Sequence, residues 1–428
     1  MTTAVVLAGL VLVLLTGVPI FAGLGLASIV LMLLTEGSIG SVADTVFGKL
    51  DTGLLTAIPM FAFMAHVMIR AKVVDDLYAA AHALVRHLPG GLGVATVLSC
   101  TVFAAISGSS VATALTIGTS AIPQMQRYGY RPRDAYGVVA AGGTLGILIP
   151  PSGPLILYAI VTETSIGALF LAGVIPGLLI ALIFAGFCMA QAATRRDMER
   201  LSWAGWRACG KALAKSVWAL SLPPVVLGGI YFGIFTASEA AAVGCIVGLA
   251  IAVLVYRNFG LRDLYETAFD TVRTTAMLFM ILAAAAMFGH AVTIMRLPAE
   301  LVEAVVALEA SSLAFVLAVM AVIFVLGMFL ETIAIILITT PIVFPVMLEL
   351  GIDPIWYGIL LMVNLELALI TPPVGMNLFV IKGIARAPLS EIIHGILPYV
   401  ALMLLGLVLV LVFPQTALWL PEIAGFGR

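Results

Sequence analysis

Residues 141–154 read AGGTLGILIPPSGP and interrupt an apolar run that extends from 135 to 160. The adjacent prolines Pro150 and Pro151 lack backbone N–H groups and disfavour helix in the residues before them. Gly142-Gly143 weakens a helix further. We therefore expect two half-helices joined by an irregular segment, and the fold depends on this broken helix.

The composition places the run in a membrane. The 428 residues are 63% hydrophobic and 10% charged, with a mean hydropathy of +1.21. Soluble domains carry about 25% charged residues, so a soluble enzyme, a nucleic-acid-binding protein and a disordered chain are excluded. A spanning helix needs roughly 20 apolar residues, which leaves room for about ten to twelve spans. The N-terminus lacks a basic segment, so we expect no cleavable signal peptide.

A second interruption lies in the apolar run 92–123, where Ser107-Gly108-Ser109-Ser110 occupies the middle. Each arm has about 15 residues, which is short for a full span. Irregular backbone at membrane depth survives only inside protein or beside a water-filled cavity. The segment therefore predicts a re-entrant helical hairpin.

The chain repeats itself with a shift of 222 residues and no gap. Of the six prolines between 92 and 191, five fall on another proline, at positions 345, 354, 372, 373 and 398. The apolar run 92–123 falls on 314–345. We therefore expect two structural repeats, each with a re-entrant hairpin (92–123 and 311–348) and a broken transmembrane helix.

Charge shows that the repeats are inverted. Arg127 and Arg131 of the first repeat fall on Glu349 and Asp353 of the second. Lys and Arg favour the cytoplasmic side of a membrane, so the same loop lies inside in one repeat and outside in the other. With 70–91, 124–134, 192–215, 257–273 and 382–390 inside, seventeen of the twenty Lys and Arg residues are cytoplasmic. Inverted repeats are typical of secondary transporters.

The pattern suggests six segments. Residues 1–91 and 225–310 would be scaffold helices, 92–191 and 311–413 the hairpins and broken helices of a transport domain, 192–224 a basic cytoplasmic arm or linker, and 414–428 a tail. The arm, with Trp203, Trp206 and Trp218, is either an interfacial amphipathic segment or a solvated connector. Residues 3–34 form either a tight two-helix hairpin turned at Gly17-Val18-Pro19 or one broken helix, and the choice places the N-terminus outside or inside.

Each hairpin tip should meet a broken helix near the bilayer midplane, where free carbonyls favour a cation and half-helix N-termini favour an anion. Hydroxyl and carbonyl oxygens suit Na⁺, not Zn²⁺ or Cu²⁺. The first predicted Na⁺ site comprises Ser107, Gly108, Ser109, Ser110, Gly142, Gly143, Thr144 and Pro150. The second comprises Glu331, Thr332, Glu366, Thr371, Pro372, Gly375 and Asn377. The substrate is expected between the tips, at Ser109, Pro151, Ser152, Thr332 and Asn377. The alternative is that the glycine and serine residues only allow the helices to pack closely.

Glu331 and Glu366 are the clearest carboxylates inside apolar runs, and His66 and His290 also lie in such runs. Glu331 and Glu366 are functional candidates because a charge at the bilayer centre costs at least about 2.5 kcal/mol. Cation coordination, proton handling and structural capping remain open for both. For His66 and His290, whose repeat partners are not polar, we expect a hydrogen-bonded packing role rather than a proton relay.

Several long motifs resemble the large membrane subunit of TRAP (tripartite ATP-independent periplasmic) transporters, and the resemblance covers essentially the whole chain. They are SGSSVAT (107–113), AGGTLGILIPPS (141–152), SIGALFLAGVIPG (165–177), TPPVGMNLF (371–379) and Asn364-Leu-Glu366. One departure is Gly153-Pro154, where members of the family often have a small apolar residue after Pro-Pro-Ser.

The resemblance implies a multi-pass protein of the bacterial inner membrane that imports an organic acid anion, such as a dicarboxylate or sialic acid, with Na⁺ as coupling ion. It implies an elevator mechanism, in which the transport domain moves against the scaffold. It also implies a soluble periplasmic substrate-binding protein and a small four-helix membrane subunit, here expected on a separate chain. No cofactor is expected.

Three other functions fit the sequence less well. A stand-alone Na⁺- or H⁺-coupled carboxylate transporter would need neither a binding protein nor a small subunit. An ion channel would conduct without driving accumulation. A membrane enzyme lacks support because no HExxH, GxSxG or P-loop motif and no acid–base pair occurs.

Overall fold

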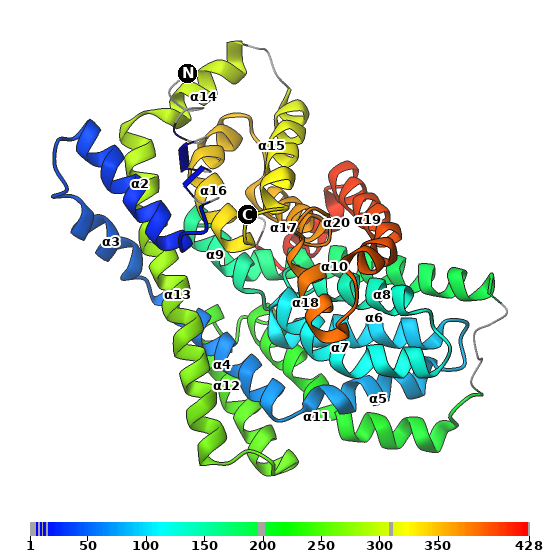
Figure 1. Cartoon of the computed structure of the whole chain (residues 1–428). Coiled ribbons are helices and arrows are strands. Elements are labelled where there is room, and N and C mark those ends of the chain that lie inside the picture. Colours follow the sequence, from blue (N-terminus) through cyan, green and yellow to red (C-terminus); the bar gives the residue numbers. More distant parts are fainter. Residues whose placement is uncertain are drawn as a thin grey trace.

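A computed structural model describes residues 6, 9–10, 12–13, 16–195, 202–307 and 311–426 (Figure 1). Every regular element in these ranges is a helix, which confirms the all-α fold class. Within the described residues, seven helices are long and apolar enough to span a membrane. This is fewer than the ten to twelve for which the chain has room, because several hairpin arms and half-helices have only 10–17 residues.

The first repeat contains the predicted hairpin and broken helix. It consists of α4 (Ala57–Arg70), α5 (Val73–Val85), the hairpin α6 (Gly91–Ser107) and α7 (Ser110–Arg127), the broken helix α8 (Pro132–Thr144) and α9 (Gly153–Thr162), and α10 (Ile166–Ala193). Pro132 opens α8 at a position where its missing N–H costs nothing. We call α6–α7 hairpin 1.

The second repeat follows the same order. It consists of α13 (Leu261–Ile294), α14 (Leu297–Ala307), the hairpin α15 (Ser312–Gly327) and α16 (Thr332–Glu349), the broken helix α17 (Pro354–Leu369) and α18 (Met376–Ala385), and α19 (Leu389–Val412). We call α15–α16 hairpin 2. The bounds of α16 equal those of α7 shifted by 222 residues, and α17 begins 222 residues after α8. Pro150-Pro151 and Pro372-Pro373 are both cis, and Gly129 and Gly351 both have positive φ.

The remaining helices flank the repeats. They are α2 (Ile20–Thr35), α3 (Val42–Leu50), the short η1 (Gly53–Thr56), α11 (Trp206–Tyr231), α12 (Ala237–Ala250) with its π-helical continuation η2 (Ile251–Tyr256), and α20 (Gln415–Ile423). α11 runs through residue 224 without a break, and part of the basic arm, 196–201, lies outside the described residues. The choice between one and two spans for 3–34 depends on residues before 16, most of which are also outside them.

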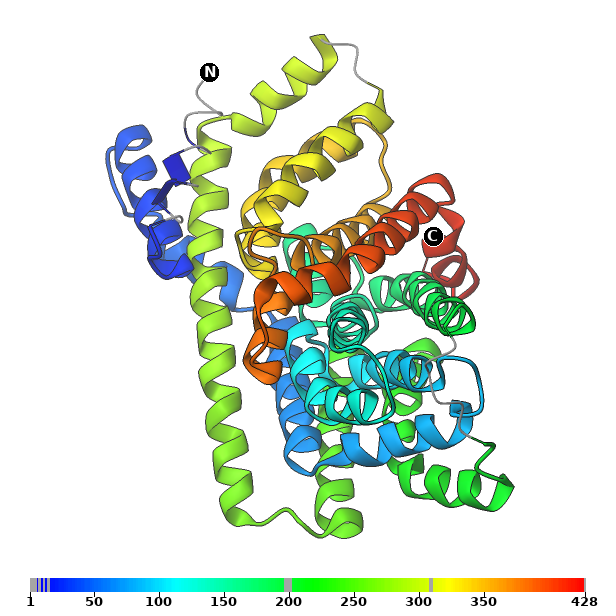
Figure 2. The same ribbon diagram turned by 45° about the vertical axis from the view of Figure 1, so that its right-hand side comes forward.

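The two repeats interleave in space. α7 packs against α18, and α16 packs against α9, so each hairpin contacts the broken helix of the other repeat. The long helix α13 contacts α2, α3, α4 and α16. Figure 2 shows hairpin 2 beside the C-terminal half of α13 and hairpin 1 nearer its middle. Each hairpin is therefore packed against helices of both repeats.

Candidate functional site

The tip of hairpin 1 lies directly against the break of the first broken helix. Gly108 has a φ of +59°, and a Cβ added there would lie 2.5 Å from the carbonyl oxygen of Pro151. A Cβ on Gly146 would lie equally close to the carbonyl oxygen of Ser109. Only glycine permits these backbones to approach so closely, so the sequence places glycines where the two irregular segments meet.

Hydroxyl groups link the same two segments. The Ser110 hydroxyl donates to the carbonyl of Thr144 at 2.9 Å, and the Thr144 hydroxyl donates to that of Ala141 at 2.7 Å. Ser107 and Thr113 share a hydrogen bond of 2.8 Å. The Ser109 hydroxyl accepts from the N–H of Ala112 as the N-cap of α7. Hydroxyl oxygens that donate keep lone pairs, so the group retains acceptors for a hard cation.

In the second repeat the tip and the break also touch. The N–H of Gly375 donates to the carbonyl of Met328 at 3.4 Å. Thr371, in the break after α17, donates its hydroxyl to the carbonyl of Leu367 in the last turn of that helix. Glu331 occupies the N-cap position of α16, but its side chain makes no capping hydrogen bond.

Two buried side chains in the second broken helix carry oxygens without a partner. Glu366 is fully buried, faces the backbone of Leu148, and neither of its carboxyl oxygens makes a hydrogen bond of ordinary geometry. Asn377 donates to the carbonyl of Ala140 at 3.3 Å, while its Oδ1 has no partner. Buried acceptors without a hydrogen bond are costly. The carboxyl oxygens of Glu366 and the amide oxygen of Asn377 are of the type that binds Na⁺.

A cavity of about 250 Å³, which we call the central cavity, lies between the hairpin tips. Its polar lining consists of Ser107, Ser109 and Ser110 from hairpin 1, Glu331 and Thr332 from hairpin 2, and His66 and Thr274 from α4 and α13. Gly108, Pro151, Gly153 and Pro154 also line it. The cavity is therefore lined by both hairpins and by α4 and α13.

The remaining predicted residues do not line this cavity. Gly142, Gly143 and Thr144 are buried behind the tip of hairpin 1. Among the predicted substrate residues, Ser109, Pro151 and Thr332 line the cavity, whereas Ser152 is buried with its hydroxyl donating to the carbonyl of Ile147. Asn377 lies against α8 instead.

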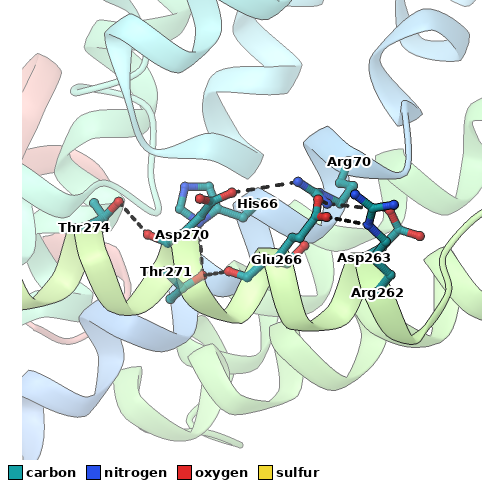
Figure 3. A network of polar contacts seen from close by, with 9 residues as sticks. His66, Arg70, Arg262, Asp263, Glu266, Asp270, Thr271 and Thr274 are labelled. Carbon is teal, nitrogen blue, oxygen red and sulfur yellow. Dashed lines mark hydrogen bonds and ion pairs between the residues drawn. The ribbon is translucent and has the colours of Figure 1, made fainter.

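Sequence reasoning missed the scaffold wall of the cavity. His66 Nδ1 is 3.0 Å from the Thr271 hydroxyl, in a hydrogen bond that joins α4 to α13. The Thr274 hydroxyl donates to the carbonyl of Asp270. Figure 3 shows that these contacts continue along α13 to Arg70, which pairs with Glu266 and with the more distant Asp263 and Asp270. The i, i+3, i+7 spacing of these carboxylates on one helical face was the available signal.

His290 is hydrogen-bonded as well, but far from the central cavity. Its Nε2 lies 3.0 Å from a carboxyl oxygen of Glu36 on the loop after α2. Both intramembrane histidines therefore make hydrogen bonds, and His66 alone borders the space between the tips.

Comparison with known proteins identifies relatives over nearly the whole chain. Residues 7–416 match the family model described as the DctM component of the tripartite ATP-independent periplasmic transporter. A C4-dicarboxylate TRAP transporter large permease protein of Pseudomonas aeruginosa is 41% identical over 94% of this chain and 95% of its own length. A sialic acid TRAP transporter large permease protein of Vibrio cholerae is 34% identical over 96% and 97%.

A structural neighbour supports the fold alone. The YdaH transporter of Alcanivorax borkumensis superposes with a TM-score of 0.64 over 88% of each chain, at 16% sequence identity.

Proposed function

Because this chain belongs to the family of DctM components of tripartite ATP-independent periplasmic transporters, an inner-membrane permease family and not an enzyme family, we propose that it imports an organic acid anion together with Na⁺. A small membrane subunit and a periplasmic substrate-binding protein complete the transporter. The binding protein delivers the anion, and this chain carries it across the membrane.

C4-dicarboxylates are the first substrate class to test. Relatives named for C4-dicarboxylate transport are 36–41% identical to this chain, whereas the relatives named for sialic acid and ectoine are 33–34% identical. A relative named for isethionate, a sulfonate, is also 36% identical. The ligands named for these relatives all carry an acidic group, which supports an organic acid as the substrate class.

The observation that carries the Na⁺ proposal is the fully buried carboxylate of Glu366, which faces the backbone of Leu148 and has no ion-pair partner among the described residues. An unpaired buried charge is strongly unfavourable, and a bound cation removes that cost. With Thr371 and the free Oδ1 of Asn377, Glu366 supplies a hard oxygen donor set for one Na⁺. Ser107, Ser109, Ser110 and the carbonyls of the first break supply a second set.

The interleaved repeats support an elevator mechanism. Hairpins and broken helices pack on one another across the repeats, while α2, α3 and α4 gather on α13. The first group would move as a transport domain and carry the central cavity, with the second group as the fixed scaffold.

The Na⁺ dependence of uptake tests this proposal. The chain is reconstituted in proteoliposomes with its small subunit and binding protein, and labelled succinate uptake is measured over a range of Na⁺ concentrations. Asn377→Ala and Ser109→Ala should each raise the Na⁺ concentration for half-maximal uptake by about tenfold, the effect of losing roughly 1.4 kcal/mol of ligation.

Two matched controls separate ligation from structural damage. Asn258→Ala removes a similar amide-to-carbonyl hydrogen bond, to Ala71, outside both sites. Ser311→Ala removes a similar N-cap, from α15. Both controls should keep the wild-type Na⁺ dependence. Unchanged Na⁺ dependence in both site variants would refute the assigned sites, and equal uptake in K⁺ would refute Na⁺ coupling.

A further inference from the structure

A second cavity lies beside the central one and has a different chemical character. It has a volume of about 430 Å³ and is bordered by α3, α13, α16 and the end of α9. Figure 1 shows these four elements grouped together, with α3 on the outer side of α13. Its polar lining consists of Thr45, Lys49, His290, Thr293 and Thr340. We call it the outer cavity.

The outer cavity contains a cation without a carboxylate partner. Nζ of the half-buried Lys49 donates to the carbonyl of Ile160 at 3.1 Å, and no ion pair of Lys49 occurs among the described residues. An ammonium has three N–H donors, so two are left for a ligand. Thr340 is only 2% exposed, and its hydroxyl has no hydrogen-bond partner. A cation and an unused hydroxyl donor in one space suit an anionic ligand.

The outer cavity lies in line with the central one along the interface between α13 and α16. Leu278 and Ile333 line the central cavity, and Leu282 and Leu337, one helical turn further along each helix, line the outer cavity. Leu278, Leu282 and Leu337 are buried. These leucines therefore form an apolar partition one turn thick between the two cavities.

The direction of α13 places the outer cavity toward the periplasm. The residues of α13 that line the outer cavity, between Leu282 and Thr293, lie at the C-terminal end of this helix. This end is next to α14 and the acidic segment 296–310, which the charge pattern places outside. A solute arriving from the periplasm would meet this cavity before the partition.

We propose that the outer cavity is a carboxylate-binding entry site, in which Lys49 pairs with a carboxylate of the organic acid and the Thr340 hydroxyl donates to it. The inference rests on the proposed import of an organic acid. A charge-assisted bond to Lys49 offsets the desolvation of the carboxylate, and the apolar partition separates this site from the central cavity.

Thiol labelling of the purified chain tests the site without transport. All four native cysteines are buried, so Thr293→Cys, at an exposed position in the lining, gives one reactive thiol. Its rates with anionic sulfonatoethyl and cationic trimethylammonioethyl methanethiosulfonate are compared. The ratio of the anionic to the cationic labelling rate should be about tenfold higher at this cysteine than on a small free thiol. Succinate should slow labelling, whereas glycerol should not. Gly48→Cys, with open space at its Cα, is the second probe should Thr293→Cys fold poorly.

Two pairs of variants, each made in the Thr293→Cys chain, test which residues cause the anion preference and the protection by succinate. Lys49→Gln should abolish both the anion preference and the protection by succinate, and Thr340→Val should weaken the protection. Lys211→Gln on exposed α11, and Thr339→Val beside Thr340 but outside the lining, should change neither.

The outcomes separate this site from the proposed function. No anion preference and no protection by succinate, in a chain that still supports Na⁺-driven uptake, would overturn the entry site and leave the transporter intact. Protection that survives Lys49→Gln would also overturn it. Protection by succinate without any Na⁺-driven uptake would retain the site and refute the coupling.

Discussion

Glycine at the tip of hairpin 1 is what allows the site to form. Gly108 adopts a left-handed conformation, and its Cα faces the Pro151 carbonyl. The approach of two irregular segments exposes backbone carbonyls to one another and to the central cavity. A side chain at this position would push the tip off the break and disperse the oxygens proposed to hold Na⁺.

Gly108→Ala should therefore cost at least roughly 1–2 kcal/mol from the left-handed backbone alone, with the clash against Pro151 in addition. We expect a lower melting temperature and a large loss of Na⁺-driven succinate uptake. Gly233→Ala is the matched control because Gly233 also has a positive φ, of +66°, but nothing lies within 4 Å of its added Cβ and it lines neither cavity. Wild-type uptake by Gly108→Ala would show that the tip need not touch the break.

For individual residues, the sequence predicted which polar side chains lie at the hairpin tips better than it predicted which residues they contact. Ser107, Ser109 and Thr332 line the central cavity as their place at the tips suggested. The separation of Asn377 from that cavity depends on how α18 packs against α8, which no local pattern encodes. His66 had no support from the repeat, because its role depends on its contact with Thr271 of a distant helix.

Close helix crossings hold elements of the two repeats together. At the crossing of α8 and α19, a Cβ on Gly395 would lie 1.9 Å from the carbonyl oxygen of Arg133, and one on Gly137 would lie 2.1 Å from that of Gly395. Small residues at such crossings are how membrane helices approach each other. The two repeats are joined through this contact.

Gly395→Ala should force α8 and α19 apart and lower stability by about 1–3 kcal/mol or more, the usual cost of overpacking. The measurement is the thermal unfolding midpoint of the purified chain. Gly186→Ala in α10 meets no neighbouring atom and should be neutral or slightly stabilising, because alanine is the better helix former. Equal midpoints for the two variants would contradict the close crossing.

Element bounds were the most predictable feature. Pro150-Pro151 marked the break between α8 and α9, and the serine-rich tip marked the turn of hairpin 1. The sequence was less informative at 223–224, where two prolines lie inside the continuous helix α11. Such prolines are tolerated when neighbouring groups satisfy the freed carbonyls, which is a tertiary effect.

For the whole molecule, the repeat predicted two equivalent halves but not their interleaving. The contacts of α7 with α18 and of α16 with α9 join residues more than 150 positions apart, and a repeat pattern specifies neither partner. The structure thus adds the contacts that each hairpin makes with the broken helix of the other repeat. The proposed mechanism requires movement across the interface between α13 and α16.

A reversible disulfide across that interface tests the mechanism most directly. The Cβ positions of Gly289 in α13 and Pro341 in α16 lie 3.6 Å apart, and those of Gly25 in α2 and Ala284 in α13 lie 3.8 Å apart, both within the range of a disulfide. The first pair links scaffold to transport domain, and the second lies within the scaffold. Succinate uptake in a Na⁺ gradient is measured after oxidation and again after reduction. Gly289 and Pro341 also line the outer cavity, so a sample of the first pair capped with methylthio groups controls for added bulk in that cavity without a link.

We predict that oxidation abolishes uptake in Gly289→Cys/Pro341→Cys, that reduction restores it, and that the capped sample and the oxidised Gly25→Cys/Ala284→Cys pair remain active. Full uptake with the α13–α16 disulfide formed would contradict movement of the transport domain against the scaffold.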